Sequence, residues 1–258
     1  ALAEKSDWEE ASGLYFLPGR IATVAVRLER YKHSQRKFSR ALKVARLFAF
    51  IPWVNMVAIG NQVGPGNSRD ESDIDFFIVT RPGRIWLSRL FASGTMKLLN
   101  LRPRPHKKRD TICLSFYVTD RGLDLDCSRL DDEDIYFRYW LANLKPLFDR
   151  DDHYTQLIRA NAWLKQELPN WQAREQNWPH RLDAFKPKAY IWTLDLLVAW
   201  LEPVARFVEM AIMPPALKGA MNKSTNCLIN DNMLKLFVHD RREEFRRKYL
   251  DRINKPGL

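Results

Sequence analysis

"VAIGNQVGPGNSRDESDIDFFIVT", residues Val57 to Thr80, is the stretch that decides the fold. It joins two apolar runs through a polar, glycine-bearing loop that ends in Asp73-Ile74-Asp75. Because alternate side chains of a strand share a face, Asp73 and Asp75 should project the same way, with Cα atoms about 6.6 Å apart. Two carboxylates this close repel each other unless a cation lies between them, and Mg²⁺ or Mn²⁺ suits oxygen ligands. The sequence therefore predicts a divalent metal site where a strand begins.

The loop before the two aspartates offers donors for an anion. Its glycines permit close backbone approach and positive φ, so that amide groups can converge on a phosphate; they are Gly60, Gly64 and Gly66. Further donors are the side chains of Asn61, Asn67 and Ser72. An anion site facing a two-carboxylate metal site is what a nucleoside triphosphate with Mg²⁺ requires.

The segments around this loop predict a mixed α/β sheet flanked by helices, an α/β (α+β) fold. Short apolar runs predict strands over Val54 to Ile59, Ile74 to Val79 and Thr111 to Val118. Apolar residues three or four positions apart predict helices over Arg20 to Phe50 and Arg84 to Leu101. The second of these helices joins the strands expected at Ile74 to Val79 and Thr111 to Val118, so these two strands should run parallel.

The rest of the chain reads as helical. A helix is expected around Ile135 to Leu144, and no convincing strand follows Asp151. Helical runs are expected near Tyr154 to Glu167, Tyr190 to Met213 and Asn232 to Ile253. We therefore expect the tail of an upstream element at residues 1–20, the sheet domain at residues 21–150, and an all-helical region at residues 151–258.

The spacing of the glycine corner and the aspartates resembles a known signature. Gly60-Asn61, eleven further residues, and then Asp73-Ile74-Asp75-Phe76, each half bordering an apolar strand, resemble the motif of the polymerase-β-type nucleotidyltransferase superfamily. The resemblance covers about Val54 to Val118. It implies that Gly60 and Asn61 hold the β and γ phosphates and that Asp73 and Asp75 bind the metal ions. Asn61 replaces the usual Ser or Gly, and its amide can donate to a phosphate oxygen.

Members of that superfamily often carry a third acid on the following strand, as metal ligand and general base. The strand expected at Thr111 to Val118 contains none. Asp110, directly before it, is the candidate, because parallel strands begin at the same edge of a sheet. Asp124 and Asp126 are weaker alternatives.

These residues predict a Mg²⁺-dependent (or Mn²⁺-dependent) nucleotidyltransferase. It would move a nucleoside monophosphate from a triphosphate such as ATP onto a hydroxyl, releasing pyrophosphate. The acceptor is open among a small molecule, a protein side chain and an RNA end. One alternative is a catalytically inactive nucleotidyltransferase fold that binds nucleotides or RNA; another is a protein-interaction module.

The amino-acid composition indicates which binding partners and which cellular compartment to expect for the protein. The excess of 42 Lys and Arg over 31 Asp and Glu gives a charge of +11, which favours anionic partners. The odd, widely spaced cysteines fit a reducing cytoplasm rather than a disulfide framework; they are Cys113, Cys127 and Cys227. The apolar tract from Tyr190 to Met213 carries Asp195, Glu202, Arg206 and Glu209, so we expect no membrane partner.

Two basic segments allow two interpretations each. The loop Arg102 to Arg109 is either a solvated surface or a contact for a triphosphate or a nucleic-acid backbone. The segment Arg241 to Arg252 mixes bases and acids at helical spacing, which favours ion pairs within a helix, with RNA binding as the other interpretation.

Overall fold

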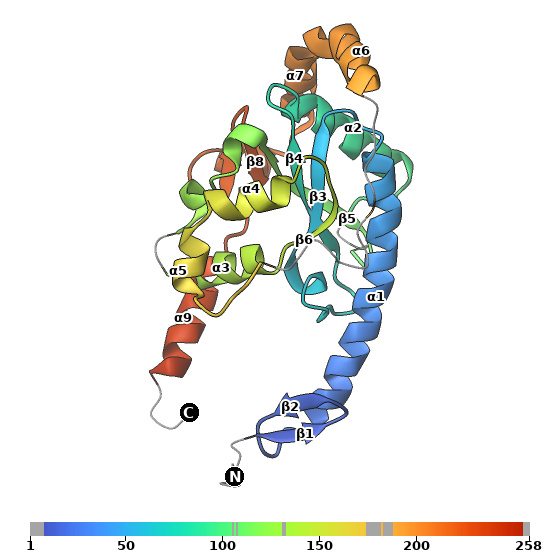
Figure 1. Ribbon diagram of the computed structural model, residues 1–258. Helices are drawn as coiled ribbons and strands as arrows, with labels where there is room; N and C mark the ends of the chain where they lie inside the picture. Colours follow the sequence, from blue (N-terminus) through green and yellow to red (C-terminus); the bar gives the residue numbers. More distant parts are fainter. Residues whose placement is uncertain are drawn as a thin grey trace.

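A computed structural model describes residues 8–104, 106, 108–130, 133–173, 182 and 188–254, apart from the side chains of residues 188 and 190–192 (Figure 1). Its centre is a six-stranded mixed sheet, which confirms the α+β fold class. The strand order is β6 (Lys145–Asp149), β3 (Val54–Ile59), β4 (Ile74–Thr80), β5 (Ile112–Thr119), β8 (Met233–Leu236) and β7 (Cys227–Ile229). Strands β4 and β5 are parallel, and the other neighbours pair antiparallel.

Helices cover both faces of the sheet, so its central strands are buried on two sides. One face carries α1 (Ala22–Phe48), α2 (Ile85–Leu98) and α7 (Glu202–Ile212), and the other carries α3 (Ile135–Ala142), α4 (His153–Ala160) and α5 (Trp163–Glu167). Strand β4 serves both layers by alternation. Phe76 and Ile78 pack with the α1 layer, whereas Phe77 and Val79 pack with the α3 layer. Side chains at odd positions of β4, including Asp75, therefore belong to the α3 side.

The elements next to the quoted stretch follow the sequence prediction. Strand β3 has the predicted bounds, and β4, β5, α1 and α2 differ from the prediction by one to three residues at their ends. The parallel pairing of β4 with β5 is also confirmed. Between β3 and β4 the chain makes a short turn, η1 (Asn61–Val63), and β3 and β4 run antiparallel.

The expectation of an all-helical region after Asp151 is wrong. Strands β7 and β8 lie there, and β8 joins the central sheet by pairing Leu234 with Tyr117 of β5. The helix expected from Asn232 begins only at α9 (Arg242–Ile253). The sheet thus includes residues on both sides of the expected boundary at residues 150 and 151.

Smaller elements complete the described chain. The start forms a hairpin of β1 (Glu9–Ala11) and β2 (Leu14–Phe16), whereas residues 1–7 of the expected tail lie outside the described residues. The tract expected as one helix is split into α6 (Lys188–Val198), η4 (Ala199–Leu201) and α7, and α8 (Pro215–Ala220) follows. None of the described helices combines the length and the apolar composition needed to span a membrane.

Candidate metal centre

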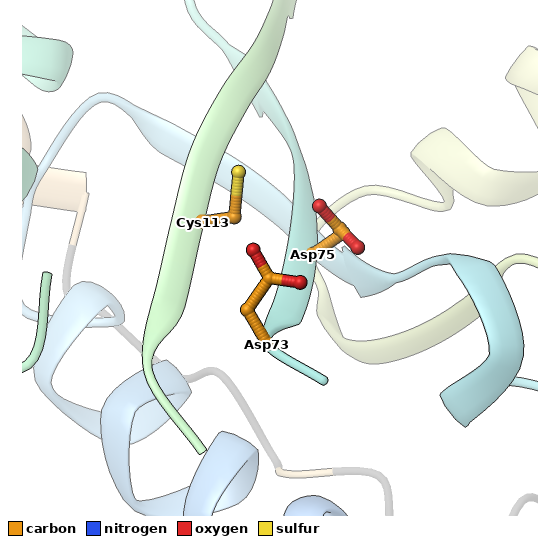
Figure 2. A group of neighbouring side chains, drawn as sticks. All are labelled: Asp73, Asp75 and Cys113. Carbon is orange, nitrogen blue, oxygen red and sulfur yellow. The ribbon is translucent and has the colours of Figure 1, made fainter. Parts of the chain in front are cut away.

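Two aspartates and a cysteine converge where β4 begins (Figure 2). Asp73 directly precedes β4, Asp75 is its second residue, and the parallel register places Cys113 of β5 opposite Asp75. A carboxylate oxygen of each aspartate and the Cys113 Sγ all lie within 4.8 Å of one another. Within the part of the chain that the structure describes, this is the one group of three side chains with the spacing of a metal site.

Burial makes the negative charge at this centre costly. Desolvation raises the pKa of Asp73, although the charges of Lys108 and Lys37 oppose it. Desolvation and the neighbouring charge of Asp73 raise the pKa of Asp75 to about 6. The pKa of the Cys113 thiol also lies well above its usual value, because of burial and the two carboxylates. At neutral pH the thiol is therefore protonated, and a cation bound at the centre would favour the ionised form of both buried carboxyl groups.

Asn61 is fixed between the carboxylate centre and α3. Its backbone is left-handed, with φ of 54°, a conformation that asparagine tolerates better than most residues. The side-chain amide donates to Asp75 Oδ2, and Asn61 Oδ1 accepts a hydrogen bond of 2.8 Å from the Tyr136 hydroxyl. The predicted phosphate donor is thus engaged with the aspartate in this structure.

The glycines of the loop between β3 and β4 mainly allow its backbone to pack closely against neighbouring residues. The Gly60 amide donates to the Asp75 carbonyl at 2.9 Å, and the amides of Gly66 and Asn67 donate within the turn itself. A Cβ at Gly60 would lie 3.0 Å from Trp140 Nε1. These three amides therefore close the loop rather than pointing at an anion, which differs from the predicted nest.

Gly64 should be the least replaceable of these glycines. A Cβ there would lie 2.2 Å from the backbone oxygen of Asn143, so Gly64→Ala must displace one of two backbone segments. We expect a loss of about 1–3 kcal/mol in the free energy of unfolding, measured by urea denaturation. Gly94→Ala in α2 is the matched control, because its Cβ would meet nothing within 4 Å, and it should stabilise by up to ~1 kcal/mol. Equal midpoints for the two variants would contradict the expectation.

The structure does not bring Asp110 to the carboxylate centre. Its side chain accepts hydrogen bonds from Lys37 Nζ at 2.8 Å and Arg36 Nε at 2.9 Å, both from α1. Burial opposes ionisation, but these two cations hold the pKa of Asp110 below its usual value. Asp110 lies in the loop before β5, and the register places Cys113 beside Asp75 instead. The third side chain at the carboxylate centre is therefore that of Cys113, and the prediction that Asp110 lies there is wrong.

The other predicted residues have different roles. Asp124 and Asp126 follow the far end of β5, where Asp124 accepts from the Asp126 amide and Asp126 pairs with Arg129. Because β4 and β5 are parallel, this end lies opposite the carboxylate centre. Ser72 donates to the Arg69 carbonyl at 3.0 Å and also lines the cavity beside Asp73.

The two basic segments differ in how many of their described residues form ion pairs. In the loop Arg102 to Arg109, Arg109 pairs with Asp70 at 3.1 Å; residues 105 and 107 lie outside the described residues. Several bases of Arg241 to Arg252 also pair with acids: Arg241 and Lys248 with Glu244, Arg242 with Asp134 and Asp240, and Arg246 with Glu133 and Glu243. The prediction of ion pairs at helical spacing is confirmed for Arg241, Arg246 and Lys248, whereas Arg242 pairs with acids outside α9.

A cavity of about 350 Å³ opens directly onto the two aspartates. That volume lies within the range of small-molecule sites. One wall is aromatic, and C-terminal residues add cations. The aromatic residues are Phe116, Tyr136, Phe137, Trp140, Phe237 and Phe245, and the cations include Lys235, Arg241 and Arg242. A second cavity, of about 440 Å³, shares Asn61 and Tyr136 with the first and extends between α3 and α9.

Lys235 is a buried cation in the wall of the first cavity. Its Nζ donates to the carbonyls of Ser128 and Thr225 at 2.9 Å each and lies 4.6 Å from the centre of the Phe137 ring. Burial, aided by the nearby Arg242, lowers the pKa of Lys235 to about 7. This lysine is therefore held by carbonyl dipoles and an aromatic face.

Sequence reasoning missed Cys113, Tyr136 and Lys235. Cys113 was accessible in principle, since two parallel strands that begin at one edge place it level with Asp75. Tyr136 and Lys235 carried no such signal, because they reach the site through α3 and through a strand from the last tenth of the chain.

The raised pKa of Asp75 predicts a pH-dependent cost. The pKa of the Asp75 carboxyl group is raised from its ordinary value of 3.8 to about 6 in the folded protein, so between these values the folded state binds more protons than the unfolded state. Stability therefore falls as pH rises through that window. Asp75→Asn removes this cost and should be about 3 kcal/mol more stable than wild type above pH 6, and little different below pH 4. Urea denaturation from pH 4 to pH 8 measures the difference. A stability difference independent of pH would contradict it.

Comparisons with known proteins add no assignment. No family model, no curated protein and no solved structure matches this chain. The functional argument therefore depends on the residues and geometry of the site.

Proposed function

We propose that this protein is a divalent-metal-dependent nucleotidyltransferase, which moves a nucleoside monophosphate from a triphosphate onto a hydroxyl group and releases pyrophosphate. The observation that carries the proposal is the pair Asp73 and Asp75, both with raised pKa, at the start of β4 and on the wall of a substrate-sized cavity. The resemblance of Gly60-Asn61 and Asp73-Ile74-Asp75 to the nucleotidyltransferase signature supports the same activity.

The donor set fits Mg²⁺ or Mn²⁺ through its oxygens. Asp73 and Asp75 would hold the ion, because hard divalent cations prefer carboxylate ligands. Cys113 fits less well, since its raised pKa keeps the thiol protonated and only the thiolate is a strong ligand. When bound, the ion would neutralise charge on the phosphates.

The transfer itself is an in-line substitution at phosphorus. The acceptor oxygen bonds to the α-phosphorus while the bond from that phosphorus to the bridging oxygen breaks, and pyrophosphate leaves with the electron pair. We assign the hydroxyl proton to one of the two carboxylates that line the cavity, Asp73 or Asp75, because Asp110 is held by Lys37 and Arg36. Under this proposal Asp110 positions the loop and does not act as the base.

Two cavities that meet near Asn61 and Tyr136 suit a reaction with two substrates. The aromatic wall of the first can stack against a planar ring, and its cations favour an anionic group. For Asn61 to bind a phosphate, its amide must turn away from Asp75. The proposed location is the cytoplasm, where nucleoside triphosphates are available.

Two measurements on the wild-type protein test the proposal. Calorimetry with ATP and Mg²⁺ measures binding, and pyrophosphate release with mixed triphosphates, Mg²⁺ and cell extract measures turnover. Mass spectrometry of the extract then identifies the acceptor by an added nucleoside monophosphate. Triphosphate binding and pyrophosphate release that need the metal are expected; no binding with or without metal would contradict the proposal.

A catalytically inactive nucleotide-binding protein is the second candidate. The observation that favours it is Cys113, a protonated thiol at the position where a third acid would assist the reaction. The same calorimetry separates the two candidates, since this one predicts triphosphate binding without any pyrophosphate release.

A further inference from the structure

Both acidic residues of helix α7 point toward the body of the protein rather than toward solvent. Glu202 accepts hydrogen bonds from the amides of Trp86 and Leu87 at 2.9 and 3.0 Å, at the beginning of α2. Glu209, which is 3% exposed, accepts from Arg89 Nε at 3.0 Å and from the Ser93 hydroxyl at 2.9 Å. Glu202 and Glu209, together with the buried Ala205, therefore form the side of α7 that contacts the body of the protein.

Helix α6 is attached in the same way. Asp195 accepts hydrogen bonds from Trp53 Nε1 at 2.9 Å, from Arg84 Nε at 2.6 Å and from Arg81 at 3.1 Å. Asp195, Glu202 and Glu209 are the only acids in the sequence from 193 to 223. All three acidic side chains of this segment therefore form hydrogen bonds with the body of the protein.

The solvent side of the same segment is apolar. Six large hydrophobic residues from α6, η4 and α7 are exposed: Leu196, Leu197, Trp200, Val204, Phe207 and Ile212. Phe207 and Trp200 expose 74% and 69% of their surface. At about 100° per residue, Val204 and Phe207 lie on the side of α7 opposite Glu209, and Ile212 is the last residue of the helix. We call these six residues the α6–α7 patch; Figure 1 shows α6 and α7 together at one end of the molecule.

The charges near the patch distinguish between possible occupants. Lys218, in α8, and Lys223, which follows α8, are both exposed. Lys218 Nζ donates to the Ala211 carbonyl of α7 at 3.0 Å, and Arg206 is paired with Asp231 at 3.3 Å. An anionic surface would attract these lysines and the chain's charge of +11. A second copy would bring the same positive charge to the interface and gain no such attraction.

We infer that the α6–α7 patch lies on the surface of a membrane that contains anionic lipids, with its apolar side chains among the headgroups and Lys218 and Lys223 against lipid phosphates. This reverses the expectation of no membrane partner, which depended on the charges of the tract from Tyr190 to Met213. Those acids do not face outward, so they do not oppose contact with a membrane surface.

Vesicle sedimentation tests the inference without nucleotide or metal, so its result is independent of the proposed activity. Wild-type protein should sediment with vesicles of phosphatidylcholine and phosphatidylglycerol, and less with phosphatidylcholine alone or at high salt. The double variant Leu197→Glu and Phe207→Glu should bind at least about tenfold more weakly. The matched control is Leu17→Glu with Ile21→Glu, since these residues are 58% and 57% exposed elsewhere.

Folding and self-association are checked on the same proteins. Circular dichroism establishes that each variant folds, and the single variant Trp200→Ser provides a second, milder reduction of the patch. Failure of wild type to sediment, or equal sedimentation of the patch variant and wild type, would overturn the inference. It would also be overturned by analytical ultracentrifugation showing a wild-type dimer, absent in the patch variant, together with no vesicle binding.

Discussion

Asp75→Asn protein should release pyrophosphate at least about 100-fold more slowly than wild type, a larger loss than the 10- to 100-fold typical for residues that only support a metal ligand. The amide keeps the size of the side chain but removes the charge that would hold the ion. Asp73→Asn should have a similar effect, because Asp73 and Asp75 lie together at the proposed metal site. Pyrophosphate release at saturating ATP and Mg²⁺ measures both variants.

Loss of activity in Asp75→Asn cannot be attributed to unfolding if the variant is more stable than wild type, as its raised pKa predicts. Asp124→Asn is the matched control, because that exposed aspartate lies at the opposite end of β5 and its oxygen can still accept from the Asp126 amide. It should release pyrophosphate at the wild-type rate. Full turnover by both Asp73→Asn and Asp75→Asn would refute the nucleotidyltransferase proposal.

Lys37→Met should lower the free energy of unfolding by about 3–5 kcal/mol, the usual cost of removing one partner from a buried ion pair. Lys37 is fully buried, and its ammonium group donates to the Asp110 carboxylate and to the carbonyls of Asp70 and Ser72 at 2.8, 3.0 and 2.6 Å. The substitution leaves three acceptors without this donor. Since Ser72 directly precedes Asp73, the site should also lose order, and metal affinity should fall.

Arg36→Met is the control for Lys37→Met, because Arg36 binds the same Asp110 carboxylate from a side chain that is 39% exposed. A partly solvated pair contributes little, so Arg36→Met should cost only about 1 kcal/mol. Adding Asp110→Asn to Lys37→Met should recover part of the loss, since no charged carboxylate would remain. Equal costs for the Arg36 and Lys37 variants in urea denaturation would show that burial of Lys37 does not matter.

The structure of the stretch from Val57 to Thr80 could be predicted because it depends on interactions between residues close in sequence. Strand β3 is a short apolar run, and β4 continues as an aromatic and β-branched one, so both appear at the predicted positions. Asp73 and Asp75 lie two residues apart in sequence, and strand alternation alone brings them together. The two aspartates of the candidate metal centre could therefore be located from a few neighbouring residues.

The features that could not be predicted from the sequence depend on contacts between residues far apart in the chain. Strand β6 begins Lys145-Pro146, which is tolerated because β6 is an edge strand. Strand β8 has four residues, and one of them is Lys235, whose buried ammonium group donates to the carbonyl of Ser128, 107 positions earlier in the chain, and to that of Thr225. The true partners of Asp110 lie more than 70 positions away on α1, so no local pattern could separate a metal ligand from an ion-pair partner.

The insertion of β8 beside β5 also sets an order of assembly during synthesis. Strand β5 carries a wall residue of the cavity, Phe116, and its outer edge pairs with residues that leave the ribosome more than a hundred positions later. Until then that edge offers free hydrogen-bonding groups and apolar side chains to other chains. A nascent chain that pauses after residue 150 would hold all three residues of the candidate metal centre and yet be prone to aggregate, because β8, which covers the edge of β5, has not yet been made.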